Sequence, residues 1–390
     1  MKIFVLLSRV PYPLDKGDKL RAFHQLKRLS KRHEIYLFAL NDSPLHKDAV
    51  DVLSSFCTKI YIYRLSKIAI AWNVFRCLFS KKPLQCGYFY NHRAKQQIDT
   101  LIKTIQPDHI YAQLIRTAEY VKTQSIKKTL DYQDVFSQGL LRLKRQSSFL
   151  KRLFYQMEYR RVQKYEKTIF NYFDNKTIIT ETDRDLMDIP DSGRLAVVPN
   201  GVDTDFFSPM QEEKTFDLIF TGNMSYPPNV DAAEYIAKNI FPHLLDKYPD
   251  IRIVLCGTSP SSRVLALQNR HITVTGWVDD MRPFYAKSRI FIAPMHLGTG
   301  LQNKLLEAMS MKIPCITSPL ASKPLHLTNQ KEVFICDTVS QYIDAIDKLF
   351  ASPDLYKTLS ENGYDFVQQN YNWNNTTAIL ENLMCQDKYE

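Results

Sequence analysis

The sequence lacks the patterns that mark membrane-spanning, secreted and metal-binding chains. No apolar run reaches the roughly 18 residues that a membrane-spanning helix needs. The short apolar segment 1–8 is closed by Arg9 and Pro11 and has no small-residue cleavage site, so we expect a buried strand rather than a secretory signal. The seven cysteines are scattered without a C-x-x-C pair. This disfavours a disulfide framework or a zinc site and favours a reducing compartment.

Cofactor and nucleic-acid motifs are missing as well. No G-x-G-x-x-G follows the first apolar run, which disfavours an NAD enzyme. No RNA- or DNA-binding signature is present, and the basic residues are not organised around aromatic stacking motifs. The two D-x-D triplets, at 183–185 and 203–205, follow no clear strand. We therefore expect no bound metal and no nucleic-acid partner.

What is present is the composition of a globular protein with two domains. The chain has 390 residues, 45% of them hydrophobic and 24% charged, which fits two domains of roughly 150–200 residues each. Charge is divided unevenly, since residues 1–195 hold 35 Lys/Arg against 19 Asp/Glu and the remainder holds 16 against 22. A basic first domain suits nucleic acid, an anionic membrane or a phosphorylated substrate.

Both halves alternate β-rich runs with helical patterns, which predicts two parallel, doubly wound sheets. The predicted strands are 3–7, 35–39, 59–63, 109–113, 128–131, 176–180, 217–221, 251–256, 271–275, 290–293 and 314–318. The turn-rich segment 198–203 is the predicted hinge between a domain at 1–197 and a domain at 198–363. In such folds ligands bind at the carboxyl ends of the strands.

The clearest chemical signal is a strand, a Gly-rich turn and a helix within residues 293–309. Gly298 and Gly300 let the backbone approach a ligand, and the helix start offers N–H groups to an anion. Lys304 and Glu307 are three residues apart and share one helix face. A cation for phosphate and a carboxylate for ribose hydroxyls would then meet at one site. The same spacing also fits an ordinary strand, turn and helix with a surface pair.

Residues 293–309 resemble the donor signature of glycosyltransferase family 4, and so do the blocks 12–24, 198–207, 220–224 and 228–232. The resemblance covers nearly the whole chain and is strongest to the group linked to exosortase (PEP-CTERM) exopolysaccharide loci. It implies an α/β GT-B fold, with two doubly wound Rossmann-like domains facing a central cleft. The C-terminal helix, at 364–390, would pack back on the first domain.

The same resemblance implies a retaining, metal-independent hexosyltransferase without a resident cofactor. Its donor would be a nucleotide-diphosphate sugar, a UDP- or GDP-sugar, and its acceptor a lipid-linked or other cell-envelope glycan. Two alternatives stay open: a GT-B sugar-nucleotide epimerase, for which no convincing acid–base pair is found, and a non-enzymatic basic protein that binds membrane or nucleic acid. A catalytically silent family member is a further alternative.

Individual roles follow from the resemblance. Glu307 matches the second glutamate of the family's E-x7-E motif, which holds the donor ribose, but Thr299 stands where the first glutamate is expected. Asn223 and Asn229 stand where relatives commonly carry an Arg and a Lys that hold the diphosphate. The diphosphate charge would then be met by Lys304, the N–H groups at 298–301 and a basic group of the first domain.

The implied site residues fall into three groups. The catalytic group is Arg116, Lys304 and Glu307, with Arg116 or Gln113 in place of a histidine that relatives carry after the fourth strand. The acceptor-binding pair is Arg21 and His24, for which ordinary surface positions are the alternative. The donor-binding set is Gly17, Gly222, Asn223, Gly257, Val278, Gly298, Thr299, Gly300, Leu301, Lys304 and Glu307.

Two segments of the basic half, 63–83 and 139–170, mix apolar and basic residues at roughly helical spacing. Helices of this kind lie on anionic membrane surfaces, and they also pack on a domain with a solvated basic face. The favoured partner is a lipid-linked acceptor at an anionic membrane surface. The expected location is the cytoplasm, with peripheral association to the inner face of the plasma membrane.

Overall fold

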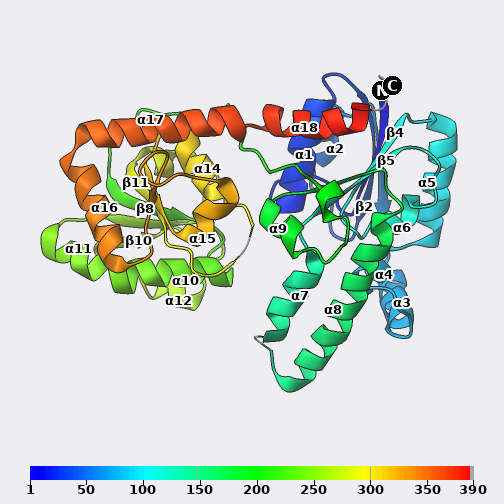
Figure 1. Cartoon of the computed structure of the whole chain (residues 1–390), viewed down its shortest axis with the longest axis horizontal. Coiled ribbons are helices and arrows are strands. Elements are labelled where there is room, and N and C mark those ends of the chain that lie inside the picture. Colours follow the sequence, from blue (N-terminus) through cyan, green and yellow to red (C-terminus); the bar gives the residue numbers. More distant parts are fainter. Residues whose placement is uncertain (146, 299, 387–390) are drawn as a thin grey trace. The chain divides into compact units, whose positions relative to one another are not determined.

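The computed structural model describes residues 1–145, 147–298 and 300–386 (Figure 1). The chain divides into two compact units: unit 1 comprises Met1–Pro199 and Thr376–Glu390, and unit 2 comprises Asn200–Asn375. Each unit is built on a parallel sheet with helices, so the predicted architecture of two parallel-sheet α/β domains is correct. Six of the seven cysteines are buried.

Unit 1 contains a seven-stranded sheet of order β3-β2-β1-β4-β5-β6-β7, in which every recorded pairing is parallel. Its strands are β1 Lys2–Leu7, β2 Glu34–Asn41, β3 Lys59–Arg64, β4 His109–Gln113, β5 Lys128–Gln133, β6 Asn175–Ile178 and β7 Ala196–Val197. The six strands predicted for this half are all present. β7 is two residues long, too short to show a periodic pattern.

Helices cover both faces of this sheet because β1 is apolar on both sides. Ile3, Val5 and Leu7 belong to one buried cluster with residues of α1 and α18, whereas Phe4 and Leu6 belong to a second cluster with residues of α5, α6 and α8. The helices of unit 1 are α1 Gly17–Leu29, α2 Ala49–Ser54, α3 Lys67–Leu78, α4 Leu84–Phe89, α5 His92–Ile105, α6 Ala118–Val121, α7 Phe136–Arg145, α8 Phe149–Phe170, α9 Glu181–Leu186 and α18 Trp373–Cys385.

The C-terminal helix that joins unit 1 is shorter than predicted. Residues up to Asn370 belong to α17 (Pro353–Asn370), whose buried residues Leu359 and Val367 lie in the core of unit 2. The return begins at Thr376, within α18. There Leu380 packs in the unit 1 core, and Glu381 Oε1 lies 2.9 Å from His33 Nε2. The predicted helix 364–390 therefore merged the end of one helix with the next.

Unit 2 contains a six-stranded parallel sheet of order β10-β9-β8-β11-β12-β13. Its strands are β8 Phe216–Thr221, β9 Ile253–Cys256, β10 Ile272–Val274, β11 Ser288–Ala293, β12 Cys315–Thr317 and β13 Phe334–Ile335, and its principal helices are α10 Pro227–Tyr235, α11 Phe241–Lys247, α12 Ser262–Leu265, α13 Arg282–Ala286, α14 Asn303–Ser310, α15 Pro319–Ser322, α16 Val339–Ala351 and α17. From β8 the chain proceeds outward to β10, and from β11 it proceeds the other way to β13. The carboxyl ends of β8 and β11 thus form the switch point where ligands bind in such sheets.

Candidate donor-binding site

Two glycines open the backbone at this switch point. Gly222 follows β8 with φ +154°, and Gly257 follows β9 with φ +150°. A Cβ on Gly257 would lie 1.8 Å from the carbonyl oxygen of Gly222, and a Cβ on Gly222 would lie 2.6 Å from Asn229 Nδ2. Both positions therefore require glycine, and the two loops approach each other without side chains between them.

The loop after β11 leads into α14 through Gly298 and Gly300, which have φ values of +105° and +86°. The N-cap residue Gln302 makes no side-chain hydrogen bond to the helix start. The N–H groups at the start of α14 that this side chain does not bond can donate to an anion, in the way that helix starts bind phosphate. Thr299, a predicted donor residue in this loop, lies outside the described residues.

Lys304 in the first turn of α14 is held by two contacts from neighbouring elements. Its Nζ donates a hydrogen bond to Asn229 Oδ1 and lies 4.7 Å from the centroid of the Phe220 ring. Asn229 in turn donates to the carbonyl oxygen of Asn223 at 2.9 Å. Burial lowers the pKa of Lys304 to about 7, against the opposing charge of Glu307. The two asparagines thus position this lysine and the loop after β8.

Glu307, one turn further along α14, is anchored through a tyrosine. Its Oε2 accepts a hydrogen bond from the Tyr285 hydroxyl at 2.9 Å, and that hydroxyl lies 2.8 Å from Thr221 Oγ1. Burial raises the pKa of Glu307, whereas the bond from Tyr285 and the charge of Lys304 lower it. The sequence analysis missed Tyr285, because a tyrosine on the five-residue helix α13 carries no local signal.

Some of the predicted donor residues contact one another at the switch point, whereas others pack into the core of unit 2. Gly222, Asn223, Gly257, Lys304 and Glu307 are joined by the contacts described above. Val278 and Leu301 are partly buried and pack against the core of unit 2, so in this structure their side chains serve the fold and only their backbones remain for a donor.

Unit 1 places the predicted acceptor-binding pair in its core, so that prediction is wrong. Arg21 is 0% exposed, and its Nε and NH2 donate to the two oxygens of Asp131 at 2.7 and 3.2 Å. Thr177 and Tyr111 also donate to this carboxylate. His24 is 4% exposed. The face of α1 that carries both residues packs onto the sheet.

Arg116 lies just beyond the carboxyl end of β4 and is partly buried. Its guanidinium is 5.1 Å from the ring centroids of both Phe89 and Phe136, and its Nε donates to Gln85 Oε1 at 3.2 Å. Burial, and then Arg9, lower the pKa of Arg116 to about 10. Gly17 is the exposed first residue of α1, and nothing around it within unit 1 requires glycine.

Unpaired donors gather at this edge of unit 1. Three buried groups, Arg116 NH1, Gln113 Nε2 and Gln133 Nε2, have no hydrogen-bond partner among the described residues. They follow or end β4 and β5, which are neighbours in the sheet. Buried donors without partners are rare in native proteins, so an acceptor rich in oxygen atoms would satisfy them.

Within residues 1–145, 147–298 and 300–386, no three His, Cys, Asp or Glu side chains gather as metal ligands would. No helix in those same ranges has the length and apolar character required to cross a bilayer.

Comparison with known proteins supports the assignment of unit 2. Residues 215–352, which include β8 through α16, match the family model described as "Glycosyl transferases group 1". This match covers the glycine loops, Lys304 and Glu307. It supports a group 1 glycosyltransferase of the GT-B type.

Relatives and one solved structure are also similar to this chain. An uncharacterized 44.6 kDa protein in the cps region of Klebsiella pneumoniae is 22% identical over 95% of this chain and 96% of its own. An Escherichia coli protein, UDP-Gal:alpha-D-GlcNAc-diphosphoundecaprenol alpha-1,3-galactosyltransferase, is 25% identical over 40% of this chain and 45% of its own. The Anabaena protein HepE, solved with UDP and glucose, superposes with a TM-score of 0.67 at 10% identity over 99% of this chain and 100% of its own.

Proposed function

We propose that the protein transfers a hexose from a nucleotide-diphosphate sugar to a lipid-linked glycan acceptor, with retention of the anomeric configuration and without a metal ion. The observation that carries this proposal is the arrangement of Lys304 and Glu307 on α14 beside the two glycine loops. It places a cation, a carboxylate and free helix N–H groups at the switch point of a sheet whose sequence matches group 1 glycosyltransferases.

The chemistry follows from what each group can do. Glu307 keeps one oxygen bonded to Tyr285, so its other oxygen is available to accept hydrogen bonds from ribose hydroxyls. In the transition state negative charge develops on the diphosphate leaving group. A protonated Lys304 and the N–H groups of α14 stabilise that charge, and such electrostatic stabilisation is usually the largest catalytic contribution. The loops at Gly222 and Gly257 let the nucleotide approach the backbone.

The acceptor side is inferred from unit 1. Arg116, which is partly exposed and whose NH1 has no hydrogen-bond partner among the described residues, suits the hydroxyl and phosphate oxygens of a glycan diphosphate. The relative from Escherichia coli is named for such an acceptor, a sugar linked to diphosphoundecaprenol. The relative from Klebsiella pneumoniae is named for its place in a cps region, which fits exopolysaccharide synthesis. HepE was solved with UDP, and we propose a UDP-sugar as the donor.

A donor screen tests the proposal. Thermal shifts and product formation are measured with UDP-, GDP- and dTDP-sugars, in EDTA and in Mg²⁺, for the wild type, Glu307→Ala and the surface control Glu212→Ala. We expect a UDP-sugar to stabilise the wild type and the control but not Glu307→Ala, because selective binding to the folded state raises stability. Donor binding without turnover on any lipid-linked acceptor would indicate a silent relative, and no shift with any nucleotide sugar would refute the donor site.

A further inference from the structure

The most unusual surface of the protein lies on unit 1, on α3. Four large apolar side chains of this helix and its C-cap, Ile68, Trp72, Phe75 and Phe79, are between 52% and 83% exposed. Their spacing of four, three and four residues places them on one helical face. Trp72 and Phe75 stack with ring centroids 6.0 Å apart, and Phe75 and Phe79 meet edge to face at 5.3 Å. Exposed apolar stripes of this kind mark interaction sites.

A second apolar face projects from the start of α8. Phe149, Leu150, Leu153, Phe154 and Met157 are 36% to 78% exposed and recur at positions that share one side of the helix. α7 and α8 form a long hairpin that extends away from the sheet, on the same side of unit 1 as α3 (Figure 1).

The two elements are tied together by a single arginine. Arg161 of α8 donates hydrogen bonds to the carbonyl oxygens of Cys77 and Leu78, at 3.2 and 2.8 Å. These carbonyls end α3, so the arginine caps that helix and fixes its position relative to the hairpin. We call the α3 face, the α8 face and the basic residues beside them the apolar–basic surface.

The charge on this surface has one sign. Segments 64–82 and 136–157 contain ten Lys and Arg residues and no Asp or Glu. Most of these cations, Lys67, Arg76, Lys81, Lys151 and Arg152 among them, are exposed. Basic residues beside inserted aromatic and aliphatic side chains match the requirements of an anionic lipid surface, which attracts each nearby cation and solvates the apolar groups.

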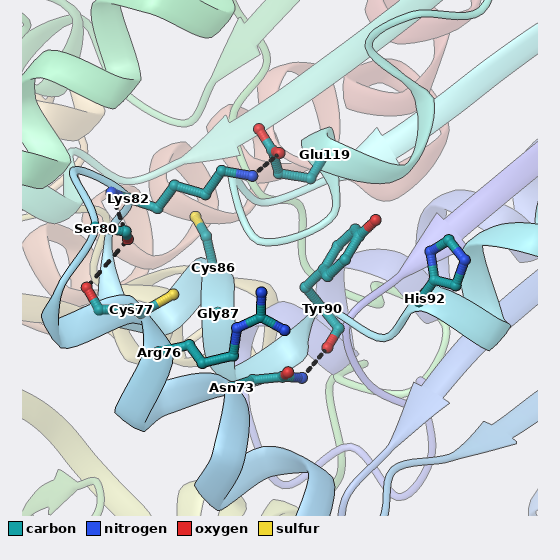
Figure 2. A pocket seen from close by; sticks show the side chains of 10 residues that line it. All are labelled: Asn73, Arg76, Cys77, Ser80, Lys82, Cys86, Gly87, Tyr90, His92 and Glu119. Atoms are coloured by element: carbon teal, nitrogen blue, oxygen red, sulfur yellow. Dashed lines mark hydrogen bonds and ion pairs between the residues drawn. The ribbon is translucent and has the colours of Figure 1, made fainter.

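Behind the α3 stripe lies a cavity of about 420 Å³ (Figure 2). Asn73, Arg76 and Cys77 of α3 line it, together with Ser80 just beyond the helix. At its rim Lys82 pairs with Glu119 at 2.7 Å, and Asn73 donates to the carbonyl oxygen of Tyr90. α3 thus packs on unit 1 through Ile70 and Cys77, and its apolar stripe is directed outward.

We propose that the apolar–basic surface docks unit 1 on an anionic lipid bilayer, with the α3 stripe and the apolar face at the start of α8 inserted at the level of the head groups. This inference concerns the acceptor side of the proposed function, because a lipid-linked glycan is presented at such a surface. It does not depend on the donor site, and its test uses no nucleotide.

The test is vesicle binding by the full chain. Binding is measured by co-sedimentation with phosphatidylcholine vesicles and with vesicles containing one quarter phosphatidylglycerol, at low and high salt. We expect binding only to the anionic vesicles, weakened by salt. Phe75→Ser with Phe79→Ser, or Leu150→Ser with Leu153→Ser, should reduce the affinity about tenfold or more. Leu265→Ser, an exposed leucine of unit 2, is the matched control and should bind like the wild type.

Insertion has its own optical readout. The chain has three tryptophans. Trp373 is buried, so in a Trp277→Phe background Trp72 is the exposed indole. Anionic vesicles should shift its emission to the blue and protect it from acrylamide. Equal binding to both vesicle types, or serine variants that bind like the wild type, would overturn the proposal. A wild-type dimer in sedimentation equilibrium, with monomeric serine variants, would overturn it too, because the stripe would then be a contact between two copies.

Discussion

Donor binding should be accompanied by proton uptake at Lys304, and the pKa of this lysine determines how many protons are bound at each pH. Burial lowers the pKa of Lys304 to about 7. At pH 8 only about one lysine in eleven is then charged, whereas at pH 6 about ten in eleven are. A diphosphate beside Nζ favours the charged form and raises this pKa. Binding at pH 8 should therefore take up about 0.9 proton, and binding at pH 6 about 0.1.

Because donor binding is coupled to the protonation of Lys304, the affinity for a nucleotide sugar should depend on pH. Because the pKa of Lys304 is lowered in the free protein, the charged form that binds diphosphate becomes scarcer as pH rises through about 7. The dissociation constant of a nucleotide sugar should thus be about tenfold larger at pH 8 than at pH 6, a difference of roughly 1.4 kcal/mol. UDP-glucose is a suitable probe, since its diphosphate is a diester and does not titrate in this range.

Isothermal titration calorimetry in two buffers of different ionisation enthalpy measures the proton uptake directly. Lys304→Met should bind more weakly with no uptake, and Lys304→Arg should retain binding without the pH dependence, because a guanidinium stays charged. His296 lies in the same loop, 3.6 Å from Asp231, so the experiment is repeated in a His296→Gln background. No uptake at pH 8, or uptake that persists in Lys304→Met, would refute the reasoning.

Three further substitutions test other parts of the structure. Gly257→Ala would drive its Cβ into the carbonyl oxygen of Gly222, so nucleotide-sugar affinity in calorimetry should fall more than about tenfold and melting should shift several degrees lower. Arg21→Met leaves the carboxylate of Asp131 buried without its cation, and urea titration should show a loss of about 3–5 kcal/mol in the free energy of unfolding. Gly87→Ala would place a Cβ 2.2 Å from a sulfur of α3, so vesicle binding should weaken while the calorimetric donor affinity stays unchanged.

The fold was predictable because its signals are local. Each predicted strand is a short apolar run between helical patterns, and such alternation is enough to indicate parallel sheets. The errors lie where local signals fail. β7 and β13 are two residues long, and the break between α17 and α18 interrupts a continuous helical pattern. At the break the backbone N–H of Asn375 donates to Asn372 Oδ1 at 2.9 Å, a helix cap that the prediction overlooked.

The residues of the candidate site also separate into those that a local sequence pattern predicted and those that it did not. Lys304 and Glu307 were found because they stand three positions apart on one predicted helix. Their partners Asn229 and Tyr285 come from other elements, and no spacing in the sequence joins them. Arg21 was assigned to the acceptor because its helix follows the loop at Gly17, and an ordinary surface position was the alternative. Its true partner, Asp131, is 110 residues away in the chain, and which face of α1 meets the sheet is decided by that pairing.

The contacts of Lys304 with Asn229, and of Asn229 with Asn223, explain why neutral residues stand at positions 223 and 229. Lys304 Nζ is within hydrogen-bonding reach of the Asn229 side chain. A lysine at 229 would set two ammonium groups side by side, and unit charges 4 Å apart repel by about 4 kcal/mol at an effective dielectric constant of 20. A neutral residue at 229 and a single cation at 304 therefore form one consistent arrangement. At pH 7 about half of the Lys304 side chains are then charged, and a diphosphate beside Nζ favours the charged form.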